Sequence, residues 1–213
     1  MPATPVTLQT VTVTGTRIVG APPTSPVIDI SQKQMIEAGQ TNLGEVVRSI
    51  PENFSGGQNP GIALGAEADG IVNQNLSGGS ALDLRGLGPD ATLTLLNGHR
   101  LSFDGFGQAV DISQIPLAAV DRIEIVTDGA SAIYGSDAVA GVANVILKPD
   151  YNGISTTVRF GGATAGGDFQ RQYSLVGGRR WGSGGFIATL NSESDTAITG
   201  QQRSYTRYLP TPY

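Results

Sequence analysis

The sequence predicts an α+β domain with a small mixed β-sheet and short helices, followed by the first antiparallel strands of a transmembrane β-barrel. Three observations carry this prediction. Thirty glycines and only 15% charged residues are unusual for a helical enzyme and typical of a turn-rich β or mixed protein. Residues 27–150 combine short amphipathic helical patterns with β-branched runs, whereas residues 151–213 carry runs of weak apolar–polar alternation. The length of 213 residues allows one sizeable domain and a further fragment.

The first 26 residues are rich in proline and threonine, a composition that predicts a mobile segment. Within them, residues 8–15 (LQTVTVTG) largely alternate threonine with apolar residues. Taken alone, this alternation favours an ordinary edge strand.

Two short helices are predicted at the start of the α+β domain. Ser31 offers an N-cap for a helix over residues 33–38, and a glycine follows it. Either Thr41 or Asn42 caps a second helix over residues 43–50, which a proline then stops. The second helix has one apolar face, so we expect both helices to pack in the domain rather than to form a site.

Residues 82–85 and 92–96 predict strands, joined by GLGPDA at residues 86–91. This hexapeptide fits the dinucleotide-binding pattern G-x-G-x-x-A, but that motif needs a helix directly after it. The residues that follow are β-prone, so we expect no nucleotide site here. His99, the only histidine, follows an Asn-Gly hairpin-type turn without a cysteine or carboxylate cluster nearby, so we expect a turn residue rather than a metal ligand or a base.

The stretch from residue 120 to 148 predicts two strands around a glycine-punctuated turn. Residues 122–126 alternate charged and β-branched side chains, which suits a strand with one apolar face. Residues 142–147 are apolar apart from Asn144, like a strand with little exposure. Pro149 closes this stretch because proline cannot continue a sheet ladder.

After residue 150 the pattern changes to alternation over runs of about ten residues, separated by glycine-rich turns, and a transmembrane β-strand needs about 9–11 residues. Trp181, with Tyr173 and Phe186, would suit an aromatic girdle at a membrane interface. The alternative is a small soluble meander. Three strands cannot close a barrel, so we expect the chain to be a fragment of a larger protein.

Two stretches resemble the plug domain of TonB-dependent outer-membrane receptors: LDLRGLGPDATLTLLNGHRL at residues 82–101 and VDRIEIVTDGASAIYGSDAVAGVANVILK at 120–148. In that family one strand ends in L-R-G, another ends in N-G-x-R, and the run ERIEV…GAxAxxYGSxAxxGVINxxxK follows. The resemblance covers most of residues 8–150. Asp121 stands where the family usually has glutamate, and Ala143 where isoleucine or valine is common.

This resemblance implies a mobile N-terminal segment at residues 1–26, a plug domain at 27–150, and about three barrel strands with a loop at 151–213. It implies energy-coupled import of a scarce solute, such as a ferric siderophore, across the Gram-negative outer membrane. The plug would lie inside the barrel, with the N-terminus in the periplasm. Cobalamin or oligosaccharide import, and a periplasmic signalling or binding module without transport, are the alternatives.

The resemblance also implies three sets of functional residues. The partner is a TonB-type periplasmic energy-transducing protein, which would add a strand to a TonB-box-like coupling segment. Charged residues on neighbouring strands would form a plug–barrel latch, meaning ion pairs that hold the plug in place, unless they are ordinary surface charges. The long loop at residues 52–80, and a later glycine-rich one, would face the solute unless they are only solvated. The coupling segment is Leu8, Gln9, Thr10, Val11, Thr12, Val13 and Thr14; the latch is Arg85, Arg122 and Glu124; the loop residues are Asn53, Phe54, Gln58, Asn59, Asn73, Gln74, Asn75, Phe103 and Phe106.

Composition excludes several classes of function. A net charge of −5 without a lysine or arginine cluster argues against nucleic acid. The absence of cysteine excludes disulfides and thiolate metal sites. No nucleophile–base pair, metal cluster or phosphate cradle is evident, so we expect no enzymatic activity and no cofactor. No signal peptide opens the chain, and no apolar run approaches the length of a membrane helix. The partners that the resemblance implies are the TonB-type protein, outer-membrane lipid and the imported solute.

Overall fold

The structure is a computed structural model of the chain, and it describes residues 14, 25–54, 79–103 and 109–204. It divides into two units, Met1–Leu147 and Lys148–Tyr213, each of which is described by itself. Among the described residues, no helix combines the length and the hydropathy needed to cross a membrane.

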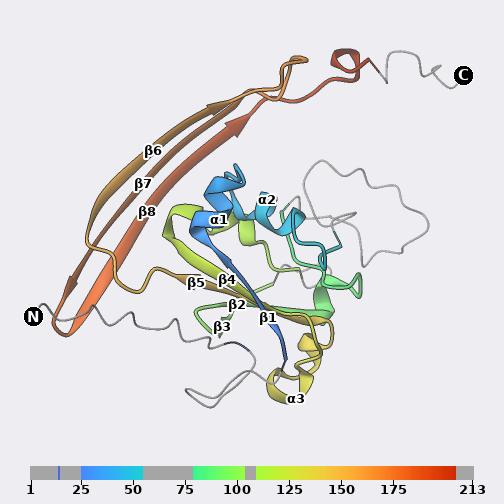
Figure 1. Cartoon of the computed structure of the whole chain (residues 1–213), viewed down its shortest axis with the longest axis vertical. Helices are drawn as coiled ribbons and strands as arrows, with labels where there is room; N and C mark the ends of the chain where they lie inside the picture. The colour runs from blue at the N-terminus through green and yellow to red at the C-terminus, as the bar shows by residue number, and fades with distance from the viewer. Residues whose placement is uncertain (1–13, 15–24, 55–78, 104–108, 205–213) are drawn as a thin grey trace, which may run out of the picture. The chain divides into compact units, whose positions relative to one another are not determined.

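The first unit is built on a five-stranded mixed sheet (Figure 1). The strand order is β1-β4-β5-β2-β3, so strands far apart in the sequence are neighbours. Only β2 and β5 run parallel; the other neighbouring pairs are antiparallel. The strands are β1 (Val27–Ser31), β2 (Thr92–Leu96), β3 (His99–Arg100), β4 (Val120–Val126) and β5 (Gly141–Leu147).

Two short helices follow β1, as the sequence predicts, and local capping fixes where they begin. Ser31 caps α1 (Gln32–Glu37) through a capping box: its hydroxyl accepts from the Gln34 N–H, and its own N–H donates to the Gln34 side chain. Asn42 caps α2 (Leu43–Arg48) by accepting from the Glu45 N–H at 3.0 Å. The second helix ends two residues earlier than expected.

The two helices pack on one face of the sheet. Met35 of α1 and Leu43, Val46 and Val47 of α2 are fully buried in one cluster with Ile123 and Ile125 of β4. Because side chains alternate along a strand, Glu124, between these two isoleucines, belongs to the opposite face. A smaller cluster on that face joins β2, β4 and β5 to the short helices α3 (Ser131–Tyr134) and η5 (Ser136–Ala138).

One strand prediction was wrong: residues 82–85 form no ladder. Leu84 makes only an isolated bridge with Asn53. Arg85 then takes a left-handed conformation with φ of 60°, which turns the chain out of the extended path. Leu82 and Leu84 are nevertheless buried, so this irregular segment packs into the core.

The second unit is an antiparallel sheet of three strands in the order β6-β7-β8 (Figure 1). The strands are β6 (Gly153–Gly161), β7 (Gln170–Trp181) and β8 (Gly184–Asp195). Their lengths of 9, 12 and 12 residues suit the start of a barrel, and within the described part of the chain they do not close one. The predicted fold class, a mixed α+β domain followed by antiparallel strands, is confirmed.

Candidate functional site

A buried polar network lies on the face of β4 opposite to the one that packs against α1 and α2. Glu124 lies opposite Asp29 of β1 and Asn144 of β5 in the sheet register. Its side chain is fully buried, and an ionised carboxylate is costly to bury unless it is paired and hydrogen-bonded. Arg122 supplies that pairing, with its Nε at 2.9 Å and its Nη2 at 2.8 Å from Glu124 Oε1.

Arg122 also joins the network to more exposed carboxylates. Its Nη1 lies 2.8 Å from Asp121 Oδ2, and its Nε lies 3.9 Å from Asp29 Oδ2. Partial burial alone would lower the pKa of Arg122, but the hydrogen bonds to Glu124 and Asp121 outweigh it and raise that pKa. Partial burial raises the pKa of the Asp29 carboxyl, and the charge of Arg122 offsets this rise only in part. The guanidinium therefore stays charged and holds the network together.

Thr14, far away in the sequence, completes this network. Its hydroxyl donates to Glu124 Oε2 at 2.6 Å, and its backbone N–H donates to the same oxygen at 3.1 Å. The Asn144 amide donates to the Thr14 hydroxyl oxygen at 3.0 Å and accepts from the Gly98 N–H at 2.9 Å. All three polar side chains of this cluster, at residues 14, 124 and 144, are buried.

The three residues expected to form a plug–barrel latch do not lie together. Arg122 and Glu124 pair with each other, whereas Arg85 binds backbone carbonyls elsewhere in the same unit. Its Nε donates to Ala140 at 3.0 Å and its Nη2 to Val139 at 2.6 Å. A role of these residues in holding the plug to the barrel stays a prediction.

Sequence reasoning missed Asn144 as a member of the network. The signal was present, because Asn144 is the one polar side chain in an otherwise apolar strand. An amide buried in such a strand needs hydrogen-bond partners, and it has them in Thr14 and Gly98.

The expected solute-facing residues fall into two groups. Asn53 is buried, donates to the Val47 carbonyl at 3.0 Å and accepts from the Asp83 N–H at 2.7 Å. Both ends of this amide are therefore used inside the unit, which corrects the expectation of an open loop residue. Phe54 and Phe103 are exposed. The remaining candidates lie outside the described residues: Gln58, Asn59, Asn73, Gln74, Asn75, Phe106 and the coupling segment from Leu8 to Val13.

A cavity of about 650 Å³ adjoins the network on the first unit, beside the β2–β3 turn. His99, Arg100, Tyr134 and Asn144 line it. Arg100 is held by the carboxylate of Asp137 and the carbonyl of Tyr134. In the described part of the chain no three histidine, cysteine or acidic residues are grouped to hold a metal ion.

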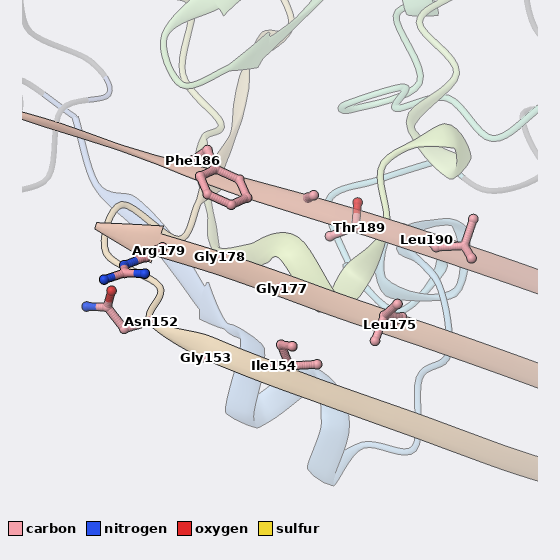
Figure 2. Close-up of a pocket in the computed structure, with 11 residues that line it drawn as sticks. Asn152, Gly153, Ile154, Leu175, Gly177, Gly178, Arg179, Phe186, Thr189 and Leu190 are labelled. Atoms are coloured by element: carbon pink, nitrogen blue, oxygen red, sulfur yellow. The ribbon is translucent and has the colours of Figure 1, made fainter. Parts of the chain in front are cut away.

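The second unit presents an apolar face that no other described part of the unit covers. Ile154, Leu175, Phe186 and Leu190 are all exposed on it, and Ile154 reaches 80% exposure. They surround a cavity of about 690 Å³, with Asn152 and Arg179 at one end, as Figure 2 shows. Apolar side chains that alternate with polar ones along each strand are typical of transmembrane β-strands.

Comparison with known proteins agrees with both units. Residues 22–142 match the family model of the TonB-dependent receptor plug domain. Among solved structures, the chain is similar to the ferric enterobactin receptor PfeA of Pseudomonas aeruginosa (21% identity, TM-score 0.59), covering 83% of this chain and 26% of the receptor.

Two further solved structures show the same fold. The siderophore receptor PirA of Pseudomonas aeruginosa has 23% identity and a TM-score of 0.53, with 80% of this chain and 29% of the receptor covered. The siderophore receptor PiuA of Acinetobacter baumannii has 21% identity and a TM-score of 0.55, with 80% and 21% covered. This chain thus spans between about a fifth and three tenths of the length of these receptors. Since the plug model matches more than half of the sequence, the chain belongs to the family of TonB-dependent receptor plug domains.

Proposed function

We propose that this chain is the plug and the first barrel strands of an outer-membrane receptor that imports a scarce solute with energy supplied through a TonB-type protein. The observation that carries the proposal is the order of the two units. A mixed-sheet plug is followed directly by antiparallel strands with an exposed apolar face. Such strands need lipid or further barrel wall around them, which supports a place in the outer membrane.

The solute that we propose is a ferric siderophore. Supporting this, the similar solved structures named above are siderophore receptors, and the PfeA structure holds enterobactin. The plug would sit inside the barrel with the N-terminus in the periplasm, and no bond chemistry would be involved. The alternative solutes are cobalamin and an oligosaccharide, and uptake of each should be measured beside that of the siderophores.

Coupling to the energy source is assigned to Leu8–Thr14. A partner that adds a strand binds backbone N–H and C=O groups, so the side chains matter less than the donors. Proline removes a donor and fixes φ, so Val11→Pro should abolish energy-dependent uptake while the solute still binds at the cell surface. Thr12→Ala is the matched control, because it keeps the backbone donor, and it should transport nearly as well as the parent.

Uptake and surface binding of iron-loaded siderophores, enterobactin among them, should be measured side by side in cells that express the full receptor. Equal loss of binding and uptake in Val11→Pro would show that the segment is an ordinary structural strand. Full transport in Val11→Pro would remove residues 8–14 from the coupling mechanism.

A further inference from the structure

We propose that Glu124 and Asn144 form a docking site on the plug sheet for Thr14, and that this contact anchors the end of the coupling segment. The coupling role rests on the proposed function, whereas the docking contact does not depend on it. The two sheet residues lie opposite each other in the β4–β5 register and are 0% and 2% exposed. They thus offer a buried pair of polar groups on the sheet to which Thr14 binds.

The geometry of this pair selects a hydroxyl group. Glu124 Oε2 takes a proton donor at 2.6 Å, while the Asn144 amide presents a donor 3.0 Å from the same hydroxyl oxygen. A hydroxyl donates and accepts at once, so threonine and serine satisfy both neighbours. Valine has the shape of threonine but can do neither, so it would leave both buried groups without this contact.

The contact also occupies the backbone that strand addition would use. The Thr14 N–H donates to Glu124 at 3.1 Å. A partner strand that paired through residue 14 would need this same donor, so docking and pairing at that residue exclude each other. The docked contact therefore marks where a partner's strand must stop. A force on the residues before Thr14 would act on Glu124 of β4 through this contact.

A thiol-accessibility experiment tests the docking site. These 213 residues contain no cysteine, so Val13→Cys introduces their one thiol, next to the anchor in sequence. Any cysteine in the rest of the receptor is first replaced by serine. Labelling of the thiol at residue 13 by a maleimide would be followed in the full receptor in isolated outer membranes, without added solute. Adding Thr14→Val should raise the labelling rate about tenfold or more, because a hydrogen bond to a charged group typically changes an equilibrium by at least that factor. Thr14→Ser should keep the parental rate.

Thr41→Val supplies the matched control. Thr41 also donates its hydroxyl to a carboxylate, that of Glu45 at 2.7 Å, within the same unit. The change removes the same kind of bond at a helix cap, so the labelling rate at residue 13 should stay at the parental value. Glu124→Gln removes the charge but keeps a carbonyl acceptor, so it should raise the rate less than Thr14→Val does.

Three outcomes would overturn the docking site: no rise in Thr14→Val, an equal rise in Thr41→Val, or a rise in Thr14→Ser as large as that in Thr14→Val. Uptake is measured separately with the proline variant described above. A faster labelling rate in Thr14→Val, together with normal transport by Val11→Pro, would support the docking site and refute the coupling role. The two claims therefore fail independently.

Discussion

Replacing Arg85 by alanine should lower the free energy of unfolding of the first unit by about 1–2 kcal/mol. The guanidinium donates to the carbonyls of Val139 and Ala140 at 2.6 and 3.0 Å, and so ties the turn after residue 84 to the start of β5. Hydrogen bonds from charged donors contribute about 1.5–3 kcal/mol each when buried. Arg85 is exposed, so water competes for these bonds. The two bonds together are therefore expected to contribute only about 1–2 kcal/mol to the free energy of unfolding.

The backbone at this residue separates the side-chain effect from strain. Arg85 has φ of 60°, and a left-handed conformation costs a non-glycine residue about 1 kcal/mol. Arg85→Gly loses the same hydrogen bonds but relieves this strain, so it should be about 1 kcal/mol more stable than Arg85→Ala. Urea unfolding followed by far-ultraviolet circular dichroism measures all three proteins.

Equal stability of the alanine and glycine variants would refute the strain argument, and parental stability of both would refute the role of the hydrogen bonds. The latch prediction has its own test, since it requires Arg85→Ala to weaken transport more than folding. Normal uptake and parental thermal stability of a full receptor that carries Arg85→Ala would refute the latch.

Three further predictions concern the first unit. Gly141→Ala should lower the stability measured by thermal unfolding by at least about 2 kcal/mol. Gly141 has φ of 145°, and a Cβ there would lie 2.4 Å from the Val126 carbonyl oxygen. Gly98→Ala, which has open space around it but also a positive φ, should cost about 1 kcal/mol. Burial alone would raise the pKa of Asp111, but hydrogen bonds from neighbouring donors outweigh this effect and lower the pKa below its ordinary value of 3.8. The ionised carboxylate therefore stabilises the fold above pH 3.8, and this stabilisation is lost as the pH falls through the lowered pKa. Unfolding measured against pH should therefore show less acid sensitivity in Asp111→Asn than in the parent. Residues 27–150 should fold alone in water, and protease digestion without detergent should leave a core of that size; a resistant core that keeps the strands of the second unit would contradict this.

Local features were predictable from the sequence because they depend on residues a few positions apart. Ser31 and Gln34 form the capping box that begins α1, and both belong to one turn of chain. The strands of the second unit followed from alternation over consecutive residues. The strand expected at residues 82–85 was wrong because Leu82 and Leu84 are buried by packing of an irregular segment in the core and not by pairing in a ladder.

The spaced motifs of residues 82–101 and 120–148 determined the family, and the alternation after residue 150 predicted the strands of the second unit. Only the tertiary structure decided that Thr14, Glu124 and Asn144 meet, since 110 and 130 residues separate the first from the other two. Alternation along a strand shows which residues share a face, but it does not show which strands become neighbours or what covers that face. For this reason the sequence alone allows Glu124 to be an ordinary exposed charge on a strand. In the folded sheet its side chain is buried and hydrogen-bonded to Arg122 and Thr14.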